Sequence, residues 1–290
     1  MKNKLKHLVP VLLVLATITG SLSACELKPK AQQKVSKQGF YFDTIIQITL
    51  YGTTDEKYID DCFDMAKKYE DMLSNTVSYS EVSKINDAAG KEYVTVSDDT
   101  LELIKNGIEY GDTSDGRFDI TIGKLSDLWN FSEIAENTDS KDNEVDASVV
   151  PSDAQIQSEL SHVNYRNIQI NGNDVMLTDS KAKLDLGGIA KGFIADKMKA
   201  YLQSKKITSG IINLGGNVLT VGEKSDGSDY TVGIQKPFDE SGEPICTVKI
   251  KDKSVVTSGI YERYYRVDGK LYHHILDTTT GYPVKNNLYS

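Results

Sequence analysis

The stretch KLDLGGIAKGFIAD, Lys183–Asp196, decides how the rest of this chain is interpreted. Its first residues favour a strand that ends near Asp185, Gly187 and Gly188 favour a turn, and the remainder favours a helix with Lys191 in its first turns. Paired glycines let a backbone approach a ligand closely, and the free N–H groups of a helix N-terminus attract anions. A lysine there adds a point charge suited to phosphate. The pattern predicts a site for a phosphate-bearing ligand, with or without a metal; the alternative is a tight strand-to-helix connection with a solvated lysine.

The first 24 residues are typical of a bacterial lipoprotein signal peptide. Lysines within the first six residues form a basic region, and the apolar run Leu8–Gly20 is shorter than a comfortable membrane span. The sequence LSAC, which ends at Cys25, resembles a lipobox and implies cleavage before Cys25 and lipidation of its sulfur; the alternative is an ordinary secretory signal. Residues 25–38 are polar and predict a flexible tether before a folded domain at 39–290. We therefore expect an extracytoplasmic protein that is lipid-anchored to the bacterial cell membrane.

The composition argues against some classes of function. The 290 residues carry 33 basic and 42 acidic side chains, a formal net charge of −9, whereas a nucleic-acid-binding domain would show a basic surface. No nucleic-acid partner is therefore expected. Apart from Cys25, the cysteines are Cys62 and Cys246, too few for a disulfide scaffold, and the sequence leaves open whether they pair.

Helix and strand patterns alternate along the whole chain. Glu56–Leu73 has the apolar spacing of an amphipathic helix, Ser80 is placed to cap a short helix, and Asp98–Asp112 predicts another helix. Strand segments are expected at Phe40–Tyr51, Tyr93–Ser97, Gly210–Gly222, Tyr230–Pro237, Glu243–Lys251, Ser254–Val267 and Leu271–Asp277. Gly215 and Gly216 interrupt one of them, at a bulge or at a close approach to a ligand. Many short strands with a few helices predict one compact α+β, or mixed α/β, domain with two subregions.

Four blocks of sequence, in this order, resemble the ApbE family of FAD:protein FMN transferases. They are GRFDITIGKLSDLWNF, DLGGIAKGFIAD, NLGGNVLTVG followed by YTVGIQKP, and TSGIYERYYRVDGKLYHHILDTTTGYP. The resemblance runs from about Phe40 to the end of the chain. It implies a single ApbE-like domain of mixed sheets with flanking helices and a flavin site between the subregions. It also implies an enzyme that binds FAD and Mg2+, transfers FMN to a Thr or Ser hydroxyl of a partner flavoprotein, and releases AMP.

The resemblance implies roles for individual residues as well. Gly188 falls where a backbone carbonyl ligates the metal, and His274 falls beside the cofactor as the candidate base for the acceptor hydroxyl. The cofactor-binding positions fall on Phe42, Thr76, Phe118, Asp119, Ile120, Asp185, Lys191, His274 and Ile275. For His273 and His274, the alternative is that strand alternation points one outward and one into a pocket as a hydrogen-bonding group.

The chain also departs from the family pattern. Phe42 replaces a common methionine and Asp43 a glycine, while Thr76 replaces a tyrosine and Thr278 a proline. These changes weaken the first flavin-lining contacts and leave the phosphate site intact. Family members continue past the T-G-Y-P turn into a strand and a helix with a D-A-x-x-T pattern, whose aspartate and threonine ligate the metal. Because this chain stops at Ser290, we expect it to be truncated, with an incomplete metal site.

Three functions remain open at this point. The first is the flavin transferase, the second is an FAD pyrophosphatase in which water replaces the protein hydroxyl, and the third is a lipid-anchored flavin-binding or electron-transfer protein without transfer activity. The expected partner of the transferase is the acceptor flavoprotein subunit of a membrane or extracytoplasmic redox system. The sequence also leaves open whether Arg263 and Arg266 hold structural carboxylates, such as Glu262, or a ligand.

Overall fold

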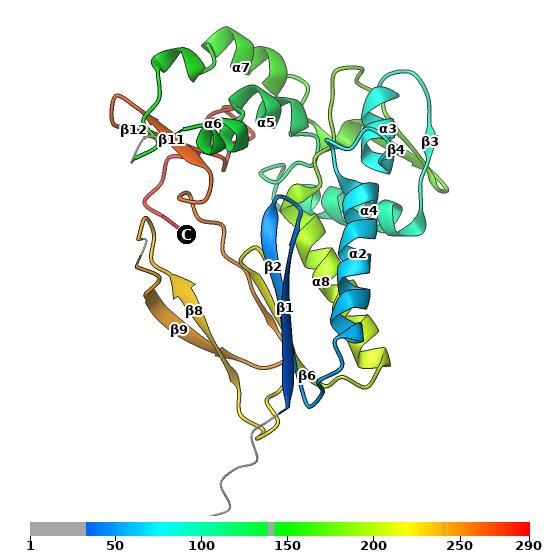
Figure 1. The fold of residues 1–290 in the computed structure, drawn as a ribbon. Coiled ribbons are helices and arrows are strands. Elements are labelled where there is room, and N and C mark those ends of the chain that lie inside the picture. Colours follow the sequence, from blue (N-terminus) through cyan, green and yellow to red (C-terminus); the bar gives the residue numbers. More distant parts are fainter. Residues whose placement is uncertain (1–32, 139–141, 240) are drawn as a thin grey trace, which may run out of the picture. The chain divides into compact units, whose positions relative to one another are not determined.

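The structure is a computed structural model that describes residues 33–138, 142–239 and 241–290 (Figure 1). The predicted signal peptide and Cys25 lie outside these ranges. The α-helices are α2 (Lys57–Leu73), α3 (Glu81–Asp87), α4 (Asp98–Thr113), α5 (Gly123–Trp129), α6 (Phe131–Glu136), α7 (Asp153–Leu160) and α8 (Gly187–Ser204), and the 3-10 helices are η1 (Ala147–Val149) and η2 (Tyr165–Asn167). The strands are β1 (Lys34–Tyr41), β2 (Thr44–Tyr51), β3 (Val94–Thr95), β4 (Ile168–Asn171), β5 (Asp174–Leu177), β6 (Ser209–Leu214), β7 (Asn217–Gly222), β8 (Tyr230–Gln235), β9 (Pro244–Ile250), β10 (Ser254–Val255), β11 (Tyr264–Val267) and β12 (Lys270–His273).

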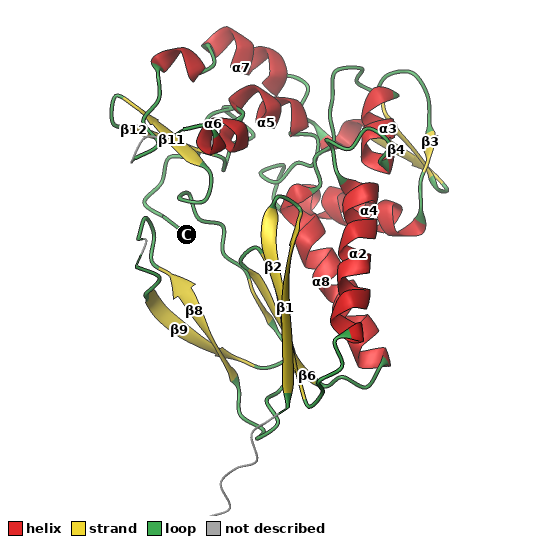
Figure 2. Ribbon diagram, in the orientation of Figure 1, coloured by secondary structure: helices red, strands yellow, loops and turns green. Residues whose placement is uncertain are grey.

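A five-stranded antiparallel sheet, in the order β1-β2-β6-β7-β10, frames the main core. Because side chains alternate along a strand, Ile46, Ile48 and Leu50 of β2 all point to one face, and none of them is exposed. Helices α2 and α8 pack on the sheet and bury Cys62 and Ile194 in the same core (Figure 2). This packing fixes the axis of α8, and with it the position of the first turn of that helix.

A second core joins α5, α6 and α7 to the β11–β12 ribbon. Trp129 at its centre is fully buried, stacks on Phe131 with ring centroids 5.5 Å apart, and donates its Nε1–H to the Gly281 carbonyl at 2.8 Å. Tyr265 and Tyr272 stack beside this pair. Both cores belong to one compact unit, Gln33–Ser290, and its helices and antiparallel sheets confirm the predicted α+β class.

A hairpin turn interrupts the strand predicted at residues 40–51, so its continuity was wrong, whereas its end at Tyr51 is confirmed. Strands β1 and β2 pair antiparallel up to Tyr41 and Thr44, and Phe42 and Asp43 form the turn with φ angles of 56° and 54°. Such turns usually carry Asn or Gly, because side chains are strained at positive φ. The Phe42 N–H donates to Glu70 Oε1 at 2.8 Å, which ties the turn to α2. Since β1 begins at Lys34, the end of the predicted tether belongs to the sheet.

Other strand expectations change less. Gly215 and Gly216, with φ of 59° and 87°, form the β6–β7 turn and not a bulge, and a Cβ on Gly215 would lie only 2.5 Å from Thr44. The last predicted strand ends at His273 instead of Asp277. Two smaller sheets, β3-β5-β4 and β8-β9, complete the architecture.

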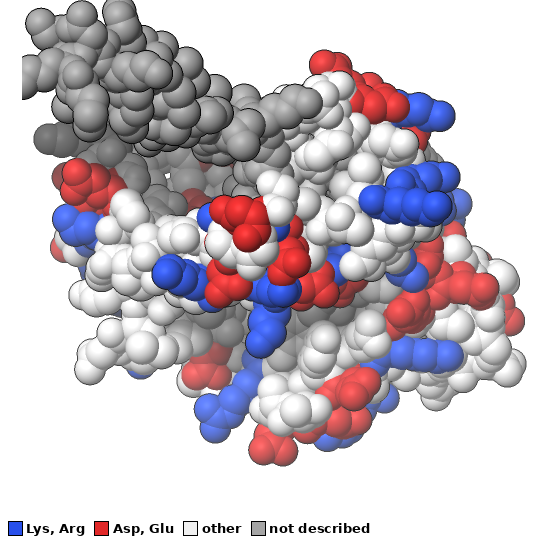
Figure 3. All heavy atoms as spheres, turned by 90° about the horizontal axis from the view of Figure 1, so that it is seen from below, with Lys and Arg blue, Asp and Glu red and all other residues white. Residues whose placement is uncertain are grey.

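The surface mixes charges of both signs. On the face seen in Figure 3, acidic and basic side chains lie interspersed among uncharged ones. None of the helices in the described ranges combines the length and the apolar composition that crossing a bilayer requires.

Candidate active site

The candidate site begins where two stretches far apart in sequence run side by side. Ile122 and Lys183 form a parallel bridge, and the Gly123 N–H donates to the Lys183 carbonyl at 3.0 Å. The Asp185 N–H donates to the Ile120 carbonyl at 2.8 Å. Each stretch then enters a helix, so this pairing brings together the starts of α5 and α8. In the stretch directly before α8, Lys183 is the one described residue that forms a β-bridge. The strand predicted there is therefore reduced to the bridge between Ile122 and Lys183.

The two glycines predicted to form a turn before α8 instead begin the helix, close to Asp185. Gly187 and Gly188 are the first two residues of the helix, and both have negative φ angles. Asp185 Oδ1 accepts the Gly187 N–H at 2.8 Å. A Cβ on Gly188 would lie 3.1 Å from Cε2 of Phe118, so glycine lets that ring lie close against the helix. The structure therefore brings together Phe118, Asp185 and Gly188, while their roles toward a ligand stay predictions.

Lys191, one turn further along α8, belongs to a cluster of charged and titratable groups. Its side chain is half-buried, and its pKa is lowered by burial and, to a smaller extent, by the positive charge of Arg263, while Glu262 opposes the shift. The charges of Arg263 and Lys191 also act on His274. The positive charge of Arg263 therefore disfavours the protonated forms of both Lys191 and His274.

His274 is held in a defined tautomer. Its main-chain N–H donates to the Arg263 carbonyl at 3.1 Å, and its ring Nδ1 lies 3.2 Å from the same oxygen. Because a carbonyl only accepts, Nδ1 carries the proton, and Nε2 is the acceptor in the neutral ring. Burial is the main cause that lowers the His274 pKa to about 4, so the ring is neutral at pH 7.

His273 is a structural residue, as one of the sequence alternatives proposed. It is buried, its Nε2–H donates to the Val284 carbonyl at 3.1 Å, and its Nδ1 accepts the Ile275 N–H at 3.3 Å. The Ile275 carbonyl in turn accepts the Val284 N–H at 2.9 Å. These bonds fix the main chain on both sides of His274.

Asp119 and Ile120 support the site from inside the fold. The buried Asp119 carboxylate accepts the Thr121 N–H at 2.7 Å, the Thr121 hydroxyl at 2.6 Å and the Tyr165 N–H at 2.9 Å. Ile120 is fully buried and packs against Gly107 of α4. The side chains of both residues are therefore engaged within the fold, and the Ile120 carbonyl is engaged as well, by the Asp185 N–H.

Two predicted residues make no hydrogen bond to this group among the described residues. Phe42 is half-buried in the β1–β2 turn, and Thr76 is exposed in the loop before α3. In the part of the chain that the structure describes, no hydrogen bond or ion pair joins either of them to Asp185 or Lys191. Their role in flavin binding stays a prediction.

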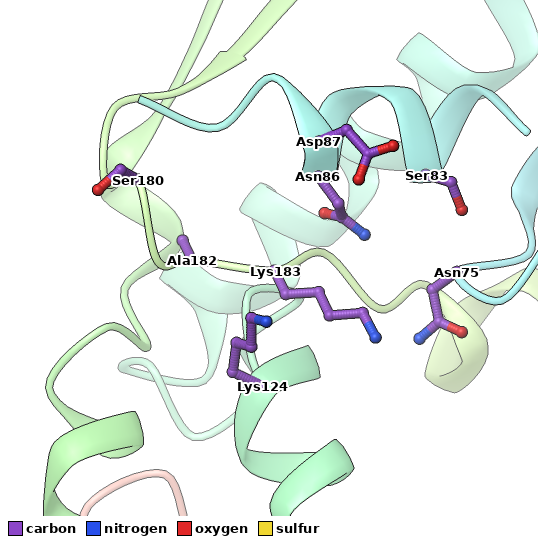
Figure 4. A pocket seen from close by; sticks show the side chains of 8 residues that line it. All are labelled: Asn75, Ser83, Asn86, Asp87, Lys124, Ser180, Ala182 and Lys183. Atoms are coloured by element: carbon purple, nitrogen blue, oxygen red, sulfur yellow. The ribbon is translucent and has the colours of Figure 1, made fainter. Parts of the chain in front are cut away.

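A polar pocket of about 280 Å3 adjoins the stretch before α8, and the sequence analysis did not single it out (Figure 4). It is lined by Asn75, Ser83, Asn86, Asp87, Lys124, Ser180, Ala182 and Lys183. Asn86 Nδ2 donates to the Leu184 carbonyl at 3.1 Å, and the Leu184 N–H donates to Asn86 Oδ1 at 2.7 Å. Asn86 therefore sets the course of the main chain immediately before Asp185. Lys183 is ion-paired with Asp127 at 2.6 Å, which leaves Lys124 as the more accessible cation of the pocket.

The described residues offer only part of a cation site. Within residues 33–138, 142–239 and 241–290, no three or more His, Cys, Asp or Glu groups are arranged to hold a metal ion. Mg2+ commonly uses one or two carboxylates together with waters and substrate phosphates. Asp185 and the Gly188 carbonyl are suitable oxygen donors at the start of α8, but by themselves they do not complete an octahedral set. The free thiols Cys62 and Cys246 form no disulfide.

Comparisons with known proteins agree with this geometry. The sequence model of the ApbE family matches residues 42–290. An FAD:protein FMN transferase of Klebsiella pneumoniae (strain 342) is 37% identical over 247 residues, which cover 84% of this chain and 72% of that protein. An ApbE protein of Thermotoga maritima has a similar crystal structure, with a TM-score of 0.77 and 32% identity over 87% of this chain and 79% of the other. The flavin transferase ApbE from Vibrio cholerae superposes with a TM-score of 0.73 at 27% identity, over 88% of this chain and 79% of the other.

Proposed function

The chain belongs to the ApbE family, and we propose that it is an FAD:protein FMN transferase. The observation that carries the proposal is the first turn of α8, where Asp185, Gly188 and the Phe118 ring lie together and Lys191 follows about one turn later. A helix start and a lysine suit the pyrophosphate of FAD, and a free imidazole nitrogen suits the proton of an acceptor hydroxyl. The Phe118 ring beside Gly188 offers an apolar surface for the flavin.

In the proposed reaction, the hydroxyl oxygen of a Thr or Ser on a partner flavoprotein bonds to the phosphorus of the FMN half of FAD. The bond from that phosphorus to the bridging oxygen breaks, and AMP leaves with the electron pair. The hydroxyl proton passes to Nε2 of His274. A pKa near 4 makes this ring a weak base in the free protein, but an anionic pyrophosphate beside it would raise the pKa toward the working range. Lys191 offsets the charge of the phosphates throughout.

We also propose that the reaction depends on Mg2+. When bound, the ion would offset charge on the pyrophosphate and on the leaving AMP. Asp185 and the Gly188 carbonyl are the donors that this part of the chain would contribute.

The proposal is tested by incubating the protein with FAD, Mg2+ and an isolated acceptor domain, followed by intact-mass measurement of the acceptor. A mass increase of one FMN, together with AMP in solution, is the expected result. Free FMN and AMP without any mass increase would identify a pyrophosphatase instead. If FAD remains unchanged, the protein has neither activity and binds flavin only.

The proposed setting is the outer face of a bacterial cell membrane, with Cys25 as the lipid-bearing residue. The lipobox-like LSAC sequence supports this location. The proposed partner is the acceptor flavoprotein subunit of a membrane or extracytoplasmic redox system, which a lipid anchor would keep within reach.

A further inference from the structure

Arg263 is a cation of the candidate site to which the proposed mechanism gives no role. Its side chain is exposed, and within the described ranges its guanidinium makes no ion pair or hydrogen bond. Arg266 differs, because its Nη1 donates to the Gly269 carbonyl at 3.4 Å and its guanidinium lies 5.7 Å from the centroid of the Phe238 ring. The two arginines that the sequence could not tell apart are therefore distinct: Arg266 is engaged within the fold, and Arg263 is available.

The β11–β12 register places Arg263 opposite His274. Tyr264 pairs with His273, and the bond from the His274 N–H to the Arg263 carbonyl extends the ladder by one step. Opposite residues of an antiparallel pair project to the same side, with Cβ atoms about 4.5–5.5 Å apart. The side chain of Arg263 therefore starts from the same side of the ribbon as the His274 ring.

Arg263 lies beside the His274 ring and directly before β11, with no ion pair among the described residues to offset its charge. Its charge also acts on Lys191 of α8, and Glu262 opposes that effect. Arginine does not lose its proton in proteins, so the repulsion persists at neutral pH. An anion bound between Lys191 and Arg263 would attract both side chains and so offset their mutual repulsion. The planar fork of a guanidinium matches two phosphate oxygens, whereas the lysine ammonium acts as a point charge.

We propose that Arg263 is a second phosphate-binding residue of this site, which contacts the pyrophosphate of the dinucleotide from its position beside His274, directly before β11, while Lys191 contacts it from α8. The identity of the ligand rests on the proposed function, whereas the binding of a diphosphate group does not. Arg263 thereby has two separate roles, since its carbonyl orients His274 and its guanidinium holds the reacting phosphates.

The test compares Arg263→Gln with the matched control Arg266→Gln in the full 290-residue chain. Affinities are measured for FAD, riboflavin and inorganic pyrophosphate, and unfolding of each variant is followed in urea. For Arg263→Gln we expect FAD and pyrophosphate to bind about 10- to 150-fold more weakly, the loss expected for a charge-assisted hydrogen bond, and riboflavin to bind as before. Arg266→Gln should leave the ratio of FAD to riboflavin affinity unchanged. Arg263→Lys should recover only part of the loss, because it restores the charge without the fork.

Two results would overturn the inference. Unchanged affinity of Arg263→Gln for FAD and pyrophosphate would show that the guanidinium does not reach the phosphates. An equal loss for riboflavin would show that Arg263 acts through the fold. If the wild-type protein binds pyrophosphate through Arg263 but transfers no FMN, the inference stands and the proposed function fails; if it binds neither FAD nor pyrophosphate, both fail.

Discussion

Replacing Lys191 with methionine should separate ligand binding from protein stability. Methionine fills similar space without the charge. Burial and the Arg263 charge both act against the Lys191 ammonium, so the free protein should lose no stability, and its free energy of unfolding should stay within about 0.5 kcal/mol of wild type or rise. Binding of FAD should lose a charge-assisted hydrogen bond of about 1.5–3 kcal/mol, which is roughly a 10- to 150-fold weaker affinity.

Flavin fluorescence titrations with FAD and riboflavin measure the binding effect, and urea unfolding without flavin measures the stability. Riboflavin has no phosphate, so its affinity should stay unchanged. Lys199→Met is the matched control, because Lys199 lies further along α8 and pairs with Asp252 at 2.8 Å, away from the first turn. This control should bind FAD like the wild type. Equal weakening of FAD and riboflavin by Lys191→Met, or a marked loss of stability, would refute the assignment of Lys191 to the phosphates.

The same variant should alter the pH dependence of stability. Because the folded protein holds the Lys191 proton less firmly than the unfolded chain, the unfolded state binds more protons between the two pKa values. Stability of the wild type therefore gains a contribution as pH rises through that alkaline range, below the ordinary lysine pKa of 10.5. Lys191→Met should lack this contribution in urea unfolding series, and Lys199→Met should retain it.

Further expectations concern catalysis, support of the site and anchoring. His274→Gln should lower kcat by about 100-fold or more and remove an acid limb with an apparent pKa of about 4 from the pH profile of kcat/KM, since protonation of Nε2 below that pH abolishes the base; a limb that persists in the variant would exclude His274. Asn86→Ala should lower the free energy of unfolding by about 2–3 kcal/mol through its two bonds to the Leu184 main chain, and normal urea unfolding would contradict that role. Cys25→Ala should abolish incorporation of labelled fatty acid into the expressed protein, and label retained by the variant would disprove the proposed lipid anchor.

Helices were predictable where a local signal marks both their start and their buried face. The apolar spacing of residues 56–73 predicted α2 to within one residue. Ser80 caps α3 as expected, with its Oγ accepting the Ser83 N–H at 2.9 Å. Such signals act over a few residues and depend little on the rest of the fold.

The hairpin at Phe42 and Asp43 was not predictable from the same kind of reasoning. Phe42 is not a typical turn former, and although Asp43 is compatible with a turn, the aromatic and β-branched residues on both sides of it favour one continuous strand. The turn exists because the antiparallel pairing of β1 and β2 and the bond from the Phe42 N–H to Glu70 together outweigh the local preference. The family pattern has a glycine at the position of Asp43, and a glycine there would have predicted the turn.

The candidate site was predictable in part for a related reason. Asp185, Gly188 and Lys191 lie on one continuous stretch, so their proximity follows from local structure. Asn86 binds the Leu184 main chain from a distant helix, and no pattern around it distinguishes it from other polar helix residues. The carbonyl of Arg263 sets the tautomer of His274. Because it is a main-chain group, the side-chain types in the sequence could not predict this contact.

In the first turn of α8, the negative charge of Asp185 lies where the phosphates of a bound dinucleotide would lie. The Gly187 N–H, which a helix start would offer to a phosphate, already bonds to the Asp185 carboxylate at 2.8 Å. A pyrophosphate arriving there would meet a group of its own sign that uses the same donor. Lys191 and Arg263 can offset the two charges of the pyrophosphate, but the charge of Asp185 then remains without a partner. A divalent cation between that carboxylate and the phosphates would remove the repulsion. This imbalance supports the proposed Mg2+ dependence more directly than the number of metal ligands does, because it arises from groups whose positions the fold has already fixed.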